Sequence, residues 1–521
     1  MSASHTAEFL RMKGLAERGV AGARHSLGFM YANGQGVARD DALAVIWYRM
    51  AADDGLAQAQ YNLGVMYQRG WGADQGATQD LVQAAHWYRQ AAQQGYAAAQ
   101  YNLGWLYARG LGVDADVQQA LFWFGKAAAQ GDPGAQHNLG MMHEGGKGVA
   151  QDLSEAAAWY RRAAEQDYAR SQFSLALLLE GGKPGTARDA EQALHWLRKS
   201  ADAGHAPAQF NLGLRYDKGR DLPQDSAQAI LWYGRAGAQG HASAQFNLAL
   251  IHDSGHGVAR DPALALAWFR KAAAQGHAAA QDNLGLCYEH GQGVEQDPAQ
   301  AAHWYREAAA QGFAGAQYHL GQLHDAGLGV PLDALEAAGW YRKAAEQGHL
   351  RAQFDLALRC DSGTGIARDA GQALYWCRKA AGQDYAPAQA MLGQWLDRDD
   401  SQADPRQAYD WYRKAAEQGH GPAQFALGLR YDSAHGVARD YEAAHFWYLC
   451  AARQGHARAQ FNLGVMYAAG QGVQADLVEA YAWLHRAAAA GLAPAAGYLQ
   501  RIAARMAPAL LAQAQAFAGA A

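Results

Sequence analysis

The sequence contains little cysteine, little proline and no long apolar run. Its four cysteines include no CxxC pair and follow no regular spacing, so the chain encodes neither a disulfide framework nor a zinc site. Proline accounts for only 12 of 521 residues, and half of all residues are apolar, which excludes a disordered chain. No stretch approaches the ~18 apolar residues of a membrane span, and residues 1–20 lack the apolar core of a signal peptide. These absences predict a cytoplasmic protein without membrane insertion.

The chain also lacks an excess of basic charge. Its formal net charge is -5, so no overall basic field attracts the phosphates of DNA or RNA. We therefore expect no nucleic-acid partner.

One internal repeat occupies most of the chain. Tryptophan recurs every 36 residues, apart from single spacings of 40, 37 and 35, and 13 of the 16 tryptophans belong to this series. Its members are Trp47, Trp87, Trp123, Trp159, Trp196, Trp232, Trp268, Trp304, Trp340, Trp376, Trp411, Trp447 and Trp483. Such a period is typical of a solenoid of helix-turn-helix units, each of which buries its apolar face against its neighbours.

Each unit follows the pattern AQxNLGxxYxxGxGVxxDxxxAxxWYRKAAxQGxx, counted from the small residue that opens it. Unit positions 1, 5 and 9 share one face of a first helix, which predicts a stripe that packs on a second helix. The GxG is interpreted as the turn that ends the first helix. The aspartate at position 18, present in all 13 units, is interpreted as the N-cap of the second helix. We expect the tryptophan to be a core residue of that helix.

The predicted fold class is all-α: a solenoid of about 13 repeats of 36 residues with helical caps. Residues 23–494 hold the repeats, residues 1–22 form an N-terminal capping helix, and residues 495–521 form a C-terminal capping half-repeat. Atypical terminal units of this kind close the open apolar ends of a solenoid.

With LGxxY, GxGV, the capping aspartate and WYRKAA at this period, the chain resembles the Sel-one-like repeat family, a branch of the tetratricopeptide-like α-solenoids. The resemblance implies a right-handed superhelix whose inner surface is lined by the first helices. It also implies a bacterial scaffold or adaptor in signalling, assembly or host interaction, with a partner protein or peptide bound along the concave face. Relatives linked to penicillin-like compounds carry paired cysteines in each repeat, and this chain departs from that pattern.

Asparagines at unit position 4 are candidate partner-binding residues. In tetratricopeptide proteins, which these units resemble, an asparagine at the matching place holds the backbone of a bound peptide, and an amide both donates and accepts hydrogen bonds. The alternative is that these amides bond to the neighbouring repeat and fix the stacking. The seven are Asn62, Asn102, Asn138, Asn211, Asn247, Asn283 and Asn462. Aromatic residues at position 3 of most units either line the same groove or pack neighbouring first helices together.

Unit position 10 is acidic in nine successive units, the fourth to the twelfth. We name these residues the acidic track: Glu144, Glu180, Asp217, Asp253, Glu289, Asp325, Asp361, Asp397 and Asp432. One interpretation is that the track attracts a basic segment of a partner, and the other is that these are solvated surface residues. Arg215, Arg359 and Arg430, two residues upstream in three units, are expected to neutralise part of the track.

Two units are irregular. The second carries a four-residue extension, and Trp71 within it lies outside the repeat pattern, which makes it a candidate binding hot spot. The eleventh replaces its glycine turn by the segment 397–405 and lacks the asparagine, which predicts a bend. Sequence drift without function is the alternative for both.

No catalytic centre is visible in the sequence. It contains neither HExxH nor a GxSxG elbow. Six histidines recur in the turn between units, and at ~10 Å per repeat they are too far apart to share a metal ion. We therefore predict a non-enzymatic protein without cofactor or metal. Two alternatives are kept: a carbohydrate- or cell-wall-binding factor of the envelope, because aromatics stack on sugars, and a hydrolase of penicillin-like compounds.

Overall fold

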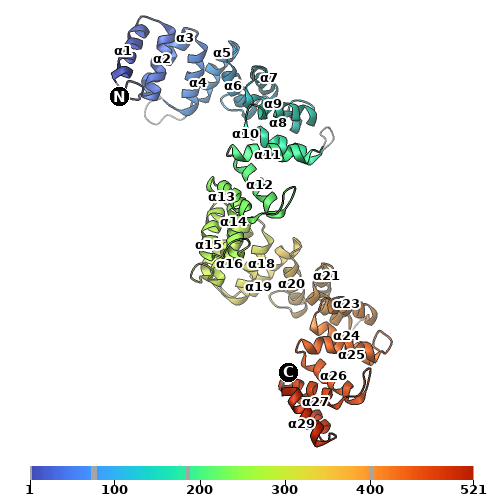
Figure 1. Cartoon of the computed structure of the whole chain (residues 1–521). Helices are drawn as coiled ribbons and strands as arrows, with labels where there is room; N and C mark the ends of the chain where they lie inside the picture. Colours follow the sequence, from blue (N-terminus) through green and yellow to red (C-terminus); the bar gives the residue numbers. More distant parts are fainter. Residues whose placement is uncertain (1–2, 72–78, 183–187, 399–403, 520–521) are drawn as a thin grey trace. The chain divides into compact units, whose positions relative to one another are not determined.

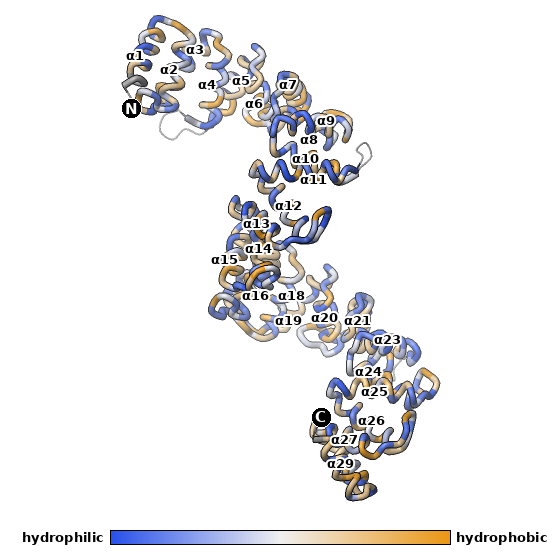
Figure 2. Tube along the Cα trace, in the orientation of Figure 1, coloured by the Kyte–Doolittle hydropathy of each residue, from blue (hydrophilic) through white to orange (hydrophobic). Residues whose placement is uncertain are grey.

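The computed structural model describes residues 3–71, 79–182, 188–398 and 404–519, and these residues form helices and no strand. The fold is an all-α solenoid, as predicted. Two compact units divide the chain, residues 1–260 and 261–521. Within each unit, successive helices pack side by side (Figure 1). Polar and apolar residues alternate along the helices (Figure 2), as expected of helices with one buried face.

In the first unit, α1 (Ala3–Glu17) precedes the repeats. The first helices are α2 (Ala21–Asn33), α4 (Ala57–Arg69), α6 (Ala97–Arg109), α8 (Pro133–Gly145), α10 (Ala169–Gly181), α12 (Ala206–Lys218) and α14 (Ala242–Ser254). The second helices are α3 (Asp41–Asp53), α5 (Leu81–Gln93), α7 (Val117–Ala129), α9 (Leu153–Ala164), α11 (Ala190–Asp202) and α13 (Ser226–Ala238).

In the second unit, the second helices are α15 (Pro262–Ala274), α17 (Pro298–Ala310), α19 (Ala334–Glu346), α21 (Ala370–Ala381), α23 (Pro405–Glu417), α25 (Tyr441–Arg453) and α27 (Leu477–Ala489). The first helices are α16 (Ala278–His290), α18 (Ala314–Ala326), α20 (Leu350–Ser362), α22 (Ala386–Leu396), α24 (Gly421–Ser433) and α26 (Ala457–Ala469). They are followed by α28 (Ala493–Ala503) and α29 (Pro508–Gly519), both of which pack against α27.

Both predicted helix-end signals are confirmed. The aspartate at position 18 caps the second helix in every repeat; in the first, Asp40 Oδ1 accepts the N–H of Leu43 at 2.9 Å. The first glycine of the GxG adopts the left-handed conformation that ends a helix, as at Gly34 with φ of 67°. The second glycine is where successive repeats touch, because a Cβ at Gly365 would lie 1.9 Å from Ala334 O.

In ten of the thirteen repeats, the residue after the repeating tryptophan is a tyrosine or phenylalanine, and its ring packs against the first helix. Tyr305 is fully buried, and a Cβ at Gly285 on the first helix would lie 2.5 Å from its ring. The tryptophans are less buried than predicted: only Trp196, Trp232 and Trp483 are buried, and the other ten are half-buried. The prediction of a tryptophan core is therefore partly wrong.

Cations from the same helix cover the outer sides of these indoles. Lys343 Nζ lies 3.7 Å from the ring centre of Trp340, and six further tryptophans carry a lysine or arginine three residues on in the same arrangement. One turn of helix brings residues three apart onto one face. The letters W and K of WYRK therefore form a cation–π pair.

A line of buried glutamines joins the repeats, and we name it the glutamine ladder. In twelve repeats the glutamine at position 2 donates its Nε2–H to a main-chain carbonyl at the end of the preceding repeat, at 2.8–3.4 Å. In nine of them its Oε1 accepts from a glutamine in the following turn, as Gln60 does from Gln94 at 2.8 Å. Each of these side chains thus links two successive turns.

Candidate functional site

The first helices carry the exposed features predicted to bind a partner. Three hollows of about 700, 540 and 500 Å³ lie along them. Two hollows are lined by predicted residues: Asn247 and Asp217 line the second, and Asn102 lines the third. Apolar residues at position 7 are exposed beside them, including Leu250 at 39%.

The seven asparagines are all half-buried and face the preceding repeat or their own helix. Asn62 Nδ2 lies 2.9 Å from His25 Nε2, one repeat back. Five of the asparagines interact with a tyrosine of the preceding repeat: Asn62, Asn102, Asn138, Asn247 and Asn462. Asn211 and Asn283 donate to carbonyls four residues back. The contacts of the five to the preceding repeat are of the kind that the stacking interpretation describes, those of Asn211 and Asn283 are not, and peptide binding by the asparagines stays a prediction.

Every carboxylate of the acidic track has an intramolecular partner. Three accept a hydrogen bond from the buried tyrosine of their own repeat and have no cation partner among the described residues: Glu144 at 2.7 Å, Glu289 at 2.5 Å and Asp432 at 3.4 Å. The other six pair with cations: Glu180, Asp217, Asp253, Asp325, Asp361 and Asp397.

Three of these cations are the predicted arginines, and each reaches back one repeat. Arg215 lies 2.6 Å from Glu180, Arg359 pairs with Asp325, and Arg430 pairs with Asp397. All three guanidinium groups are at most 12% exposed. They neutralise part of the track, as expected, and also tie successive first helices together.

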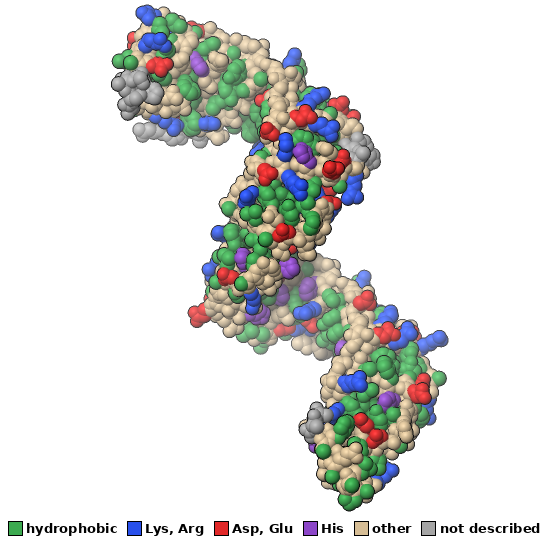
Figure 3. Space-filling model, viewed as in Figure 1, with side chains coloured by type: hydrophobic (Ala, Val, Ile, Leu, Met, Phe, Trp, Pro, Cys, Tyr) green, Lys and Arg blue, Asp and Glu red, His purple; other side chains and the backbone are tan. Residues whose placement is uncertain are grey.

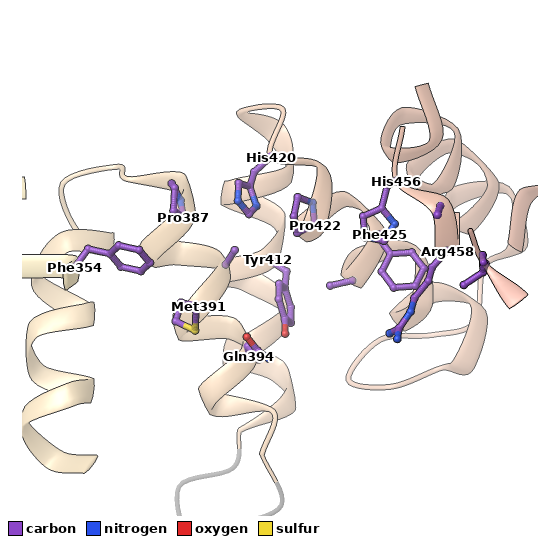
Figure 4. Close-up of a pocket in the computed structure, with 14 residues that line it drawn as sticks. Phe354, Pro387, Met391, Gln394, Tyr412, His420, Pro422, Phe425, His456 and Arg458 are labelled. Atoms are coloured by element: carbon purple, nitrogen blue, oxygen red, sulfur yellow. The ribbon is translucent and has the colours of Figure 1, made fainter. Parts of the chain in front are cut away.

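The largest of these three hollows lies at the eleventh repeat, and we name it the repeat-11 pocket (Figure 4). Repeat 11 carries Ala390 at position 3, where most repeats carry an aromatic ring, and Met391 at position 4. The pocket opens between Phe354 of repeat 10 and Phe425 of repeat 12 (Figure 4). The sequence signal was present, because repeat 11 lacks the asparagine, but sequence reasoning predicted a bend and missed the pocket.

The polar groups of this pocket include three hydrogen-bond donors, from His420, His456 and Arg458. His420 and His456 each use Nδ1 to accept a main-chain N–H at a helix start, at 3.3 Å. Burial lowers the pKa of both imidazoles, so at pH 7 each ring is neutral and carries its proton on Nε2. Arg458 adds an exposed guanidinium at the other end of the pocket. The lining contains no carboxylate.

Trp71, the predicted hot spot of repeat 2, is half-buried between two guanidinium groups. Arg39 and Arg69 lie 5.1 and 4.5 Å from its ring centre. Most of the extension that follows it, residues 72–78, lies outside the described residues, as do residues 399–403 of the irregular segment in repeat 11.

Charges of both signs are mixed over the face shown in Figure 3. Within the described ranges, no three histidine, cysteine or acidic side chains converge in a way that suits a metal ion. None of the described helices combines the length and apolar character needed to cross a bilayer.

These features define a repeat scaffold of the kind typical of protein–protein interaction. The Sel1 repeat model matches thirteen times, without a gap, from residue 21 to residue 492, and the chain belongs to the Sel1 repeat family. It is similar to a protective antigen of uropathogenic Escherichia coli, c5321, whose crystal structure displays an SLR fold: 35% identity, TM-score 0.64, covering 91% of this chain and 93% of that one. It is also similar to a Sel1 repeat protein from Oxalobacter formigenes, with 36% identity, TM-score 0.45, and 58% and 88% of the two chains covered. A search of curated proteins gives no match.

Proposed function

We propose that this chain is a non-enzymatic scaffold in the bacterial cytoplasm that binds a segment of a partner protein along its first helices. The observation that carries the proposal is the presence of hollows on the first helices of both units, each bordered by exposed or half-buried apolar side chains. Solenoids offer extended surfaces of this kind, and apolar pockets with a few polar groups anchor peptide side chains.

Two exposed leucines of neighbouring helices provide a matched test. Leu250 lines a hollow on first helix α14, and Leu231 lies on second helix α13; they are 39% and 44% exposed. If a partner binds along the first helices, Leu250→Lys weakens its capture from the native lysate at least tenfold, and Leu231→Lys leaves it unchanged. Quantitative mass spectrometry of the captured partner measures both. Loss of capture with Leu231→Lys alone would place the interface on the second helices and refute the proposal.

We further propose that the acidic track attracts a basic partner through Glu144, Glu289 and Asp432. Each of these carboxylates accepts a hydrogen bond from a tyrosine and has no cation partner among the described residues. Substituting all three by Gln, Gln and Asn removes this charge, whereas Asp361→Asn changes a carboxylate held by Arg398. A basic partner would bind the triple variant several-fold more weakly at low salt and with a flatter salt dependence. Equal capture by the triple variant and the wild type would exclude the acidic track as a recognition element.

A further inference from the structure

The pairing between position 3 and the following turn explains the shape of the repeat-11 pocket. In repeat 9, Tyr318 stacks on His349 of the next turn with ring centres 4.7 Å apart. In repeat 12, Phe425 stacks on His456 in the same way, at 4.5 Å. Position 3 and this turn thus form a ring pair in each of these repeats.

Repeat 11 retains the histidine and lacks the ring. His420 occupies the turn, but position 3 is Ala390, and no described aromatic ring stacks on His420. The resulting space has a volume of about 700 Å³, within the ~300–1,000 Å³ typical of ligand sites. It has room for an aromatic side chain and the backbone on either side.

The walls of this space suit an aromatic ring. Phe354 and Phe425 flank it, Met391 lies on its floor, and Pro387 and Pro422 stand at its rim (Figure 4). Thioether and aromatic groups attract a ring through favourable S–π and edge contacts. Proline rings have no side-chain rotamers to lose when a ligand binds.

The charge of the pocket suits a carboxylate beside that ring. His420 and His456 offer N–H groups, and Arg458 is exposed with no ion-pair partner among the described residues. The hollow of about 540 Å³ in the first unit differs, because Asp217 and Lys218 both line it. An anionic group bound in the repeat-11 pocket therefore meets donors and no competing carboxylate.

We propose that the repeat-11 pocket binds an acidic segment of a partner protein by receiving one aromatic side chain in the place of the ring missing from position 3. The inserted ring stacks on His420 between Phe354 and Phe425, and a neighbouring carboxylate of the segment pairs with Arg458. This inference rests on the proposed function and specifies the chemistry of one partner segment.

Photocrosslinking with a short peptide tests the pocket directly. The probe is acetyl-Glu-(4-benzoylphenylalanine)-Glu-amide, and tryptic mapping locates the labelled residues. We expect labelling at α22 and α24, with acetyl-Glu-Phe-Glu-amide competing at least tenfold better than the same peptide with Ala for Phe or with Lys for both Glu. Labelling spread over other repeats, or equal competition by the Ala or Lys peptide, would overturn the proposal.

Two variants and one control distinguish specific binding in this pocket from nonspecific peptide binding. Ala390→Phe restores the ring found in most repeats, so the fold is retained while labelling falls at least tenfold. Arg458→Gln weakens binding several-fold, and Arg351→Gln, an exposed arginine at the same position of repeat 10 outside the pocket, does not. Unchanged labelling of Ala390→Phe would refute the pocket. The scaffold proposal has its own test at Leu250, so a negative result here leaves that proposal standing.

Discussion

Ala434 occupies a backbone position that suits glycine. It ends α24 in the left-handed conformation with φ of 60°, whereas Gly470 ends α26 at the same repeat position with φ of 68°. A side chain in this region costs about 1–2 kcal/mol. We expect Ala434→Gly to stabilise repeat 12 by about 1 kcal/mol, part of the gain being offset by the greater entropy of an unfolded glycine. Hydrogen exchange of the α24 amides measures it, and Gly470→Ala should produce the opposite change in α26.

The glutamine ladder has a gap at Ala203. The buried Oε1 of Gln172 has no hydrogen-bond partner among the residues that the structure describes. Ala203 stands in the turn where other repeats supply a glutamine donor, as Gln239 does to Gln209 at 2.8 Å. Ala203 is exposed, so a longer side chain has room. Ala203→Gln should stabilise repeats 5 and 6 by about 1 kcal/mol, the net value of one hydrogen bond.

Urea unfolding monitored by hydrogen exchange at α10 and α12 tests the ladder. The matched change is Gln239→Ala, which leaves Gln209 Oε1 without its donor and should destabilise by about 1–3 kcal/mol. Opposite signs for the two variants are expected. Two null results would mean that water satisfies these oxygens equally well.

The capping aspartates and turn glycines were predictable from sequence because their partners lie within four residues in the chain. The glutamine ladder was not recognised, although position 2 is glutamine in twelve repeats. Its partners lie eight and about 30 residues away, and only stacking brings them together. Repeat 1 shows the same link in another form, because Arg24 and Asp54 make an ion pair at 2.6 Å at the two equivalent positions.

At the scale of the helical hairpin, residue sizes are matched across the two helices. Gly104 on α6 faces Phe124 on α7, and a Cβ there would lie 2.9 Å from the ring. Repeat 5 has Ala176 with Leu197 at these positions, and repeat 10 has Ala357 with Cys377. In these two repeats, a larger residue on the first helix thus accompanies a smaller one on the second.

This matching predicts a rescue. Gly104→Ala alone should destabilise repeat 3 by about 1–3 kcal/mol, because the added methyl group overpacks the hairpin. Adding Phe124→Leu recreates the pair of repeat 5 and should recover more than half of that loss. A double-mutant cycle of unfolding free energies measures the coupling. Additive effects would show that the two side chains do not share the space.

The helical period correctly predicted the hairpins, but the burial predicted for the tryptophan side chains was too high. A repeated residue identifies a helix and its spacing, yet residues one apart on a helix differ by 100° in direction, so the pattern WY did not reveal which ring faces the first helix. The structure assigns that role to the second letter, as at Tyr160 and Tyr305. Likewise, position 10 was correctly identified as acidic, but Arg215, Arg359 and Arg430 each pair with the carboxylate of the preceding repeat and not with that of their own.

At the scale of the whole molecule, stability is a sum of repeats and the contacts between neighbours, so the two ends need separate protection. Phe9 of α1 packs edge-on to Tyr31 of α2 at 5.5 Å, and α29 lies against α27. We propose that residues 1–22 and 495–521 act as the predicted caps. The second comprises most of α28 and all of α29.

Buried and half-buried histidines, in the turns and in the helices, make the stability of the chain dependent on pH. Burial lowers the pKa of nine histidines below their ordinary value of 6.5: His25, His137, His205, His241, His277, His349, His420, His445 and His456. In the folded chain these rings resist protonation, whereas in the unfolded chain they take up protons near pH 6.5. Acidification from pH 7 to pH 5 therefore favours unfolding, and above pH 7 this effect is absent.

We expect the thermal midpoint to fall steadily between pH 7 and pH 5. His137, whose pKa burial lowers to about 4, alone accounts for roughly 3 kcal/mol once the pH is below that value. A matched substitution identifies the source, because Asp132 caps α8 from the turn position that His241 and His349 occupy, accepting the N–H of Ala135 at 2.7 Å. His241→Asp with His349→Asp keeps both caps but removes two histidines, so calorimetry should show a shallower fall between pH 7 and pH 5. If the slope between pH 7 and pH 5 stays the same, the acid sensitivity arises from the other histidines whose pKa burial lowers, such as His137, because carboxylates protonate below this range, and His241 and His349 are only caps.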